Sequence, residues 1–341
     1  VVNLLGWAAA ATGVAYLAAG LFGGDWRAGM LSAVFFLAHP ALHIPMHEPT
    51  GFESLHILFV TLTILFCRRA WTGPEEGRAR ARRGGIFCFV VALTCKEPSV
   101  MAPFALLLLH LLSAGGAGGG FRARVWDGVR RLRGYWIVLA LYIAVRFHGL
   151  FLQPEHRNPE GVYPTMLVPG KILENTGHAL AWVPRLFDRS EWVNVYRGPV
   201  TLLFGAGTLL AVLLLPRLRD PARHRKGGIL FVVGLGIVFA AIPVVSGHMP
   251  HHFGLPVLAY SILAGVAISA VVGRMFRAPG AAALATVACG AAMIAVGHLD
   301  AQTFLHRHPM RRDAYAISTS VRGAPPVDPT RIDDGTFIAI E

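Results

Sequence analysis

The sequence predicts an all-α, polytopic membrane protein, and two observations carry this prediction. Of the 341 residues, 54% are hydrophobic and 15% are charged, and the mean hydropathy is +0.54. Soluble domains carry about 25% charged residues, whereas apolar stretches of about 20 residues are typical of membrane spans. The basic residues also gather in short segments between apolar runs, as membrane topology requires. The net charge of +12 therefore does not indicate a nucleic-acid partner.

Ten apolar segments are candidate transmembrane or half-spanning helices, since about 20 residues are needed to cross about 30 Å of hydrocarbon. They are residues 1–22, 28–46, 53–67, 86–95, 99–112, 134–152, 199–215, 228–246, 254–272 and 280–298. The fourth and fifth are short, and we interpret them as a pair folded back at Lys96-Glu97-Pro98. Proline cannot continue a helix and disfavours α geometry at the residue before it, so a break is expected there.

Two parts follow from this assignment, a multispanning membrane domain over residues 1–298 and a short tail over 299–341. The tail is no longer apolar, and we expect it to be extracytoplasmic. The chain starts without Met, inside or just before a span, so we expect it to be the interior of a longer protein.

The arginines assign the two sides of the membrane. By the positive-inside rule, the segments rich in Arg and Lys face the cytoplasm. These segments are 68–85, 113–133, 216–227 and 274–277. The alternation of sides holds only if the short folded-back pair makes two passes. Thirteen of the 15 histidines then fall on or near the opposite face, which we expect to be the extracytoplasmic side of a bacterial inner membrane or an equivalent membrane.

Lys96 and Glu97 are the first candidate site residues. Ionisable side chains at membrane depth cost at least a few kcal/mol, so they usually face a cavity or a partner. Lys96 would hold an anionic ligand, such as a lipid phosphate, as a compact point charge, with Glu97 beside it in the same cleft. The alternative is a salt bridge between Lys96 and Glu97 at the end of a short helical hairpin.

A histidine-rich stretch, HPALHIPMHEPTGFESLH, contains the next candidates. His39, His43 and His47 are spaced four apart, which would align them for a divalent metal on one unbroken helix. Prolines interrupt that run, so we favour polar groups that line a water-filled cleft. In it, Glu48 and Glu53 would orient a sugar hydroxyl or ligate an ion. The other interpretation is a polar loop at the membrane surface that binds no ligand.

Two further segments on the same side carry groups suited to phosphate. VVSGHMPHHFGLP contains His248, His251 and His252 at the start of a span, and imidazoles pair with phosphate more strongly when protonated. LYIAVRFHG places Arg146 near the outer end of its span. An arginine there either snorkels to the headgroups or clamps an anion through two hydrogen bonds.

Several of these stretches resemble the multispanning GT-C glycosyltransferases, which include protein O-mannosyltransferases, the aminoarabinose transferase acting on lipid A, and the TPR-bearing transmembrane O-mannosyltransferases. FFLAHPALH and the residues after it look like their HP-containing stretch, and ALTCKEPSVMAP is similar to their G-L-x-K-E/G-x…P segment. LYIAVRFHG resembles the Y-x-x-x-R end of a span, and GHMPHHFGLPVLAYSILAG resembles the E-R-Y-x-Y-x-P-S-x-G stretch. These motifs occur in the family's order over most of residues 2–272.

The resemblance implies inverting transfer of a sugar from a polyprenyl-phosphate donor to a protein, lipid or glycan acceptor on the extracytoplasmic side. It implies that Lys96 binds the donor phosphate and that Arg146 contacts the phosphate or supports the site. Histidines stand where the family has the arginine of E-R-Y. The family's catalytic aspartate lies in a loop that would precede Val1, so we assign no general base, and Glu48 and Glu53 are the remaining candidates.

Two other classes stay open beside the glycosyltransferase. Broken helices and intramembrane ionisable residues also occur in secondary transporters and channels, although repeated halves are missing here. The histidines leave a metal-binding or metal-transporting membrane protein as the third class. For a glycosyltransferase we expect the lipid-linked donor and the bilayer as partners, with no nucleic acid and no required metal.

Overall fold

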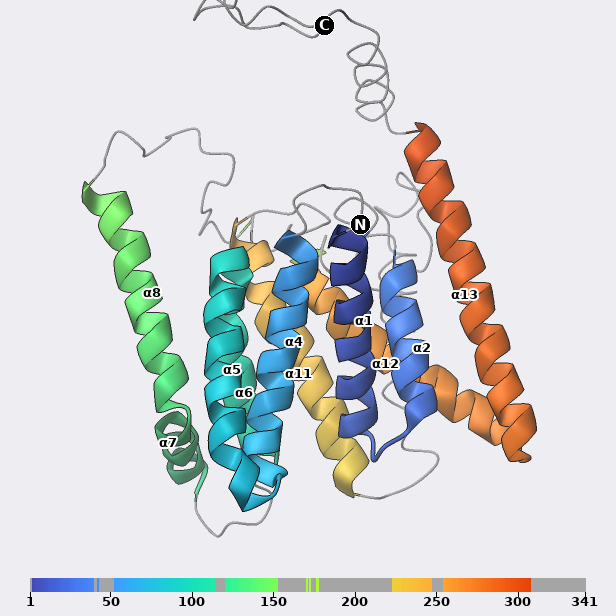
Figure 1. Ribbon diagram of the computed structural model, residues 1–341, viewed down its shortest axis with the longest axis horizontal. Helices are drawn as coiled ribbons and strands as arrows, with labels where there is room; N and C mark the ends of the chain where they lie inside the picture. Colours follow the sequence, from blue (N-terminus) through green and yellow to red (C-terminus); the bar gives the residue numbers. More distant parts are fainter. Residues whose placement is uncertain are drawn as a thin grey trace, which may run out of the picture.

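The computed structural model describes residues 2–39, 42, 52–113, 120–152, 170, 172, 176–177, 223–246 and 254–307. Within these residues the chain is all-α, as predicted, with ten α-helices and one short 3-10 helix, η2. They are α1 (Val2–Leu21), α2 (Trp26–Ala38), α4 (Phe52–Thr72), α5 (Glu75–Cys95), η2 (Glu97–Met101), α6 (Ala102–Ser113), α7 (Phe121–Arg131), α8 (Arg133–Leu152), α11 (Arg223–Ser246), α12 (Gly254–Met275) and α13 (Pro279–Arg307). Most of them stand side by side in one bundle (Figure 1).

Three of the described helices are long and apolar enough to cross a membrane, namely Asn3–Leu21, Phe52–Thr72 and Gly254–Met275. Shorter apolar helical segments accompany them. These are Trp26–Ala38, Glu97–Leu112, Gly227–Ile242 and Pro279–Ala295. The candidate span at 199–215 lies outside the described residues.

α12 is the most buried of the three long helices, and it packs closely on α2 at one crossing point. Gly265 of α12 faces Ser32 of α2, and a Cβ added to this glycine would lie 2.7 Å from the Ser32 Cα. The two backbones can approach this closely because Gly265 has no side chain. The hydroxyl of Ser32 donates a hydrogen bond to the carbonyl of Ala28, 2.6 Å away, and so is satisfied inside the bundle. Small residues allow this kind of contact between helices in membranes.

α1 and α4 pack along a row of glycines. Gly6, Gly13 and Gly20 are spaced seven apart in α1, and each faces a residue of α4 that lies the same number of positions further along the chain. The facing residues are Ser54, Thr61 and Arg68. The constant offset means that α1 and α4 run parallel, and the Arg68 guanidinium donates a hydrogen bond to the carbonyl of Gly20.

The structure corrects the predicted end of the second span. We placed this span at 28–46, but α2 ends at Ala38. His39 is extended, with φ −71° and ψ 127°, because it precedes Pro40, which disfavours α geometry at that residue. His39 is therefore the C-cap of α2 and lies outside its helical turns.

The arginine-rich segments are helical where we expected loops. Only Gly73 and Pro74 separate α4 from α5, so the arginines of the predicted 68–85 loop lie in the last turns of α4 and the first turns of α5. α5 is consequently 21 residues long, not the short span 86–95. α7 likewise forms within the predicted 113–133 loop. Arginine is a good helix former, and the apolar pattern used to find spans does not detect basic helices.

Candidate functional site

The centre of the candidate site is the helix break after α5. Lys96 has extended backbone angles, φ −162° and ψ 143°, and η2 starts directly after it. The carbonyl of Ala92 accepts two hydrogen bonds across the break, from the Lys96 N–H at 3.1 Å and from the buried Ser99 hydroxyl at 2.8 Å. The predicted break at Lys96-Glu97-Pro98 is confirmed.

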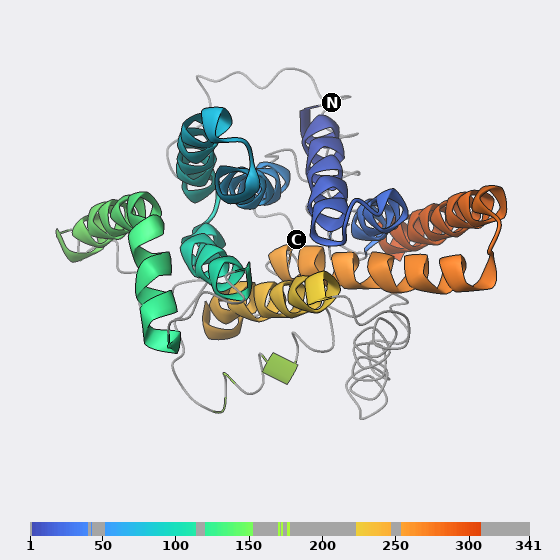
Figure 2. The same cartoon turned by 90° about the horizontal axis from the view of Figure 1, so that it is seen from below.

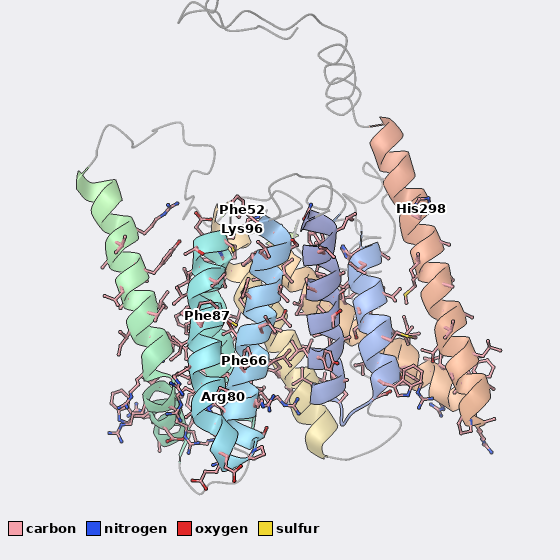
Figure 3. All side chains as sticks on the ribbon, in the orientation of Figure 1. Phe52, Phe66, Arg80, Phe87, Lys96 and His298 are labelled. Carbon is pink, nitrogen blue, oxygen red and sulfur yellow. The ribbon has the colours of Figure 1, made fainter. Side chains whose placement is uncertain are left out.

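The chain reverses its direction at this break. Figure 3 shows Arg80 near the lower end of α5 and Lys96 at its upper end, beside Phe52 at the start of α4. α6 leads back down, because His110 near its end lies 3.2 Å (Nε2 to Oδ2) from Asp127 of α7. α7 lies at the lower end of the bundle (Figure 1). Helices α5 and α6 thus form the folded-back pair that the sequence predicts.

Lys96 forms an ion pair with Glu53, in the first turn of α4. Its ammonium Nζ donates a hydrogen bond to the Glu53 Oε2, and the two side chains are only 19% and 8% exposed. The alternative that Lys96 pairs with its neighbour Glu97 is therefore wrong. A buried ion pair holds both groups in place, because either charge alone would be costly in this environment.

Glu97 instead pairs with Arg146, which reaches the break from α8. The Arg146 Nη2 lies 2.9 Å from the Glu97 Oε1, and the side chains are 61% and 59% exposed. The structure thus brings together four of the predicted site residues, two cations and two carboxylates. They come from α4, the break itself and α8, and one of the two pairs is buried while the other is open.

His56 belongs to the same end of α4 and was not among our predicted site residues. Its side chain is 1% exposed, and among the described residues neither of its ring nitrogens has a hydrogen-bond partner. It follows Glu53 by one helical turn in α4. The signal in the sequence was its place in the histidine-rich stretch. A buried polar side chain without a hydrogen-bond partner is unusual in a folded protein.

The other predicted residues are divided between the core and the undescribed part. His39 is buried, and its ring lies 6.2 Å from that of Phe35 and 6.5 Å from that of Tyr260, between ring centroids. The remaining candidates lie outside the described residues. They are His43, His47, Glu48, His248, His251 and His252. Within the part that the structure describes, no three His, Cys, Asp or Glu side chains gather in a metal-binding group.

No protein-family model, no curated protein and no solved structure matches this chain. Two cations at the end of a helical bundle can bind an anion, and the carboxylates beside them can orient the cations or accept a proton.

Proposed function

We propose that this chain is a membrane glycosyltransferase of the GT-C type, which moves a sugar from a polyprenyl-phosphate donor to an acceptor on the extracytoplasmic side. The observation that carries the proposal is the pair of cations at the break between α5 and α6: Lys96 lies at the break and pairs with Glu53, and Arg146 of α8 pairs with Glu97, the next residue of the break. The proposal places the upper end of the bundle in Figure 1 outside the cytoplasm and the Arg80 end inside it.

The two cations have different roles in this proposal. Arg146 is largely exposed, so its planar guanidinium can form two parallel hydrogen bonds to a phosphate at headgroup level. Lys96 adds a fixed positive charge, and Glu53 orients it from within the bundle. Glu97 competes with the ligand for Arg146, and its exposure allows it to move aside when phosphate binds.

Such a site supports the departure of the donor phosphate. The acceptor oxygen attacks the anomeric carbon of the sugar, the bond from that carbon to the phosphate oxygen breaks, and the electron pair leaves with the polyprenyl phosphate. Negative charge grows on the phosphate in the transition state, and cations held in place beforehand stabilise it. The acceptor must also lose a proton to a carboxylate. Glu53 is committed to Lys96, so we regard it as a positioning residue and leave the base unassigned.

The test is binding of sugar-free polyprenyl phosphate to the full-length protein in lipid nanodiscs, together with consumption of polyprenyl-phosphate-linked sugars. The single change Lys96→Met would leave the Glu53 carboxylate buried and unpaired, which confuses binding with folding. The double variant Glu53→Gln/Lys96→Met keeps the shapes and removes both charges. We expect it to fold and to bind polyprenyl phosphate about tenfold or more weakly, as loss of one charged hydrogen bond implies.

Arg146→Gln should weaken binding similarly, and Arg80→Gln, at the opposite end of α5, is the matched control that should leave it unchanged. Wild-type affinity in both site variants would refute the proposal. A secondary transporter is the second candidate, since a buried ion pair at a broken helix also occurs in transporters. It would require Lys96-dependent uptake of a soluble substrate without binding of polyprenyl phosphate.

A further inference from the structure

α7 lies to one side of the lower end of the bundle, below α8 (Figure 1). Figure 1 shows it end-on beside the upright α5 and α8, whereas the view from below in Figure 2 shows it lengthwise. Its axis is therefore roughly perpendicular to those helices. If the upright helices cross a bilayer, α7 lies parallel to the membrane surface.

One face of α7 is fixed on α6. Gly128 is buried, and a Cβ added there would lie 2.7 Å from the Cδ2 of His110. The Asp127 Oδ2 lies 3.2 Å from the Nε2 of the same histidine, and within α7 it pairs with the Arg131 Nε at 2.9 Å. Specific contacts thus determine which side of α7 faces the bundle and which side faces outward.

The outward side carries a basic aromatic stripe, formed by Arg122, Trp126 and Arg130. These residues are spaced four apart, so they follow one another along one face of the helix, and all three are exposed. The indole ring of Trp126 is 57% exposed, and the Arg130 guanidinium carbon lies 5.3 Å from the centre of this ring. The cation–π contact holds a charged group and an apolar surface side by side.

We propose that this stripe binds the headgroup phosphates of anionic phospholipids on the surface of the bilayer at the Arg80 end of the bundle. Tryptophan prefers the boundary between hydrocarbon and water, and arginine forms paired hydrogen bonds to phosphate. α7 carries four arginines against one aspartate, and that aspartate is already engaged by His110 and Arg131. A basic helix parallel to the surface with an exposed aromatic ring is suited to an anionic leaflet. The inference is independent of the proposed glycosyl transfer.

Amide hydrogen exchange of the full chain in two kinds of nanodisc tests this proposal. One disc contains only phosphatidylcholine, and the other contains phosphatidylcholine with phosphatidylglycerol. We expect the amides of residues 121–131 to exchange about tenfold more slowly in the anionic disc, since each arginine near such a surface adds attraction. Arg122→Gln/Arg130→Gln should remove the difference between the discs.

The matched control is Arg80→Gln/Arg83→Gln, which removes two exposed arginines of α5 and should keep the difference between the discs. Unchanged exchange in the core helix α1 would show that each variant is folded. Equal exchange of α7 in the two discs, or loss of the difference in the control as well, would overturn the proposal.

A second measurement places the Trp126 ring directly. Phosphatidylglycerol with brominated acyl chains quenches tryptophans that lie against lipid, and the difference between wild type and Trp126→Phe isolates the contribution of this residue. We expect Trp126 to supply a quenched component, most strongly when the bromines lie near the headgroup. No quenched component would mean that the stripe faces water or another protein, which contradicts binding to lipid.

Discussion

The ion pair between Lys96 and Glu53 allows a double-mutant cycle whose outcome depends on burial. The side chains are 19% and 8% exposed, so removing one partner leaves the other charge inside the bundle. Breaking a buried pair in this way costs about 3–5 kcal/mol, whereas replacing both partners by neutral groups of similar shape is often neutral. We therefore expect Lys96→Met to lower the free energy of unfolding by about 3–5 kcal/mol. The double variant Glu53→Gln/Lys96→Met should recover most of this loss.

The neighbouring pair of Glu97 and Arg146 is the control for this cycle, because it is exposed. Its coupling energy should be about 0–1 kcal/mol, as in surface ion pairs. The assay is equilibrium unfolding in mixed detergent micelles as the fraction of sodium dodecyl sulfate rises, followed by tryptophan fluorescence. Equal coupling energies for the two pairs would refute the argument that Lys96 is held in a buried site by Glu53.

Two more predictions concern the packing that supports the site. Gly265→Ala would place a methyl group against the backbone of α2 and should destabilise the protein by about 1–3 kcal/mol, measured in the same assay. Gly77→Ala is its control: no described atom lies within 4 Å of the added Cβ, so stability should stay the same or rise by about 0.5–1 kcal/mol. A harmless Gly265→Ala would show that α2 and α12 are not in backbone contact. Asp25→Ala should cost about 1–2 kcal/mol, because Asp25 accepts hydrogen bonds from two amides at the start of α2 and from the Ser269 hydroxyl. The hydrogen bond between Asp25 and Ser269 would contribute nothing to stability if Asp25→Ala lowered the free energy of unfolding equally in the wild type and in Ser269→Ala.

Local chemistry allowed much of the architecture to be predicted from the sequence. Apolar stretches indicate helices because a buried or lipid-facing helix needs an apolar surface along its length. Pro98 predicts the break after Lys96 because proline cannot donate a backbone hydrogen bond, and the break lies where it was expected. We did not place a helix end before Pro40, so the predicted second span, 28–46, extends beyond Ala38, where α2 ends.

The composition of the candidate site was predictable in part. Lys96, Glu97 and Arg146 stood out because charged residues are rare in such an apolar chain. His56 belongs to the quoted histidine-rich stretch but was assigned no role, because its local sequence does not distinguish a buried histidine from one at a membrane surface. The basic helix α7 was also missed, since its residues lack the long apolar run by which we searched.

The sequence by itself determined the all-α class and the helix break before Pro98, because these depend on apolar composition and on the backbone preferences of neighbouring residues. Only the tertiary structure decided which charges pair. Lys96 is next to Glu97 in the chain, yet α4 packs against α5 and brings Glu53 to the lysine, while Glu97 is met by Arg146 from α8. The physical reason is that burial and distance set the energy of an ion pair, and both arise only when helices from distant parts of the chain pack together.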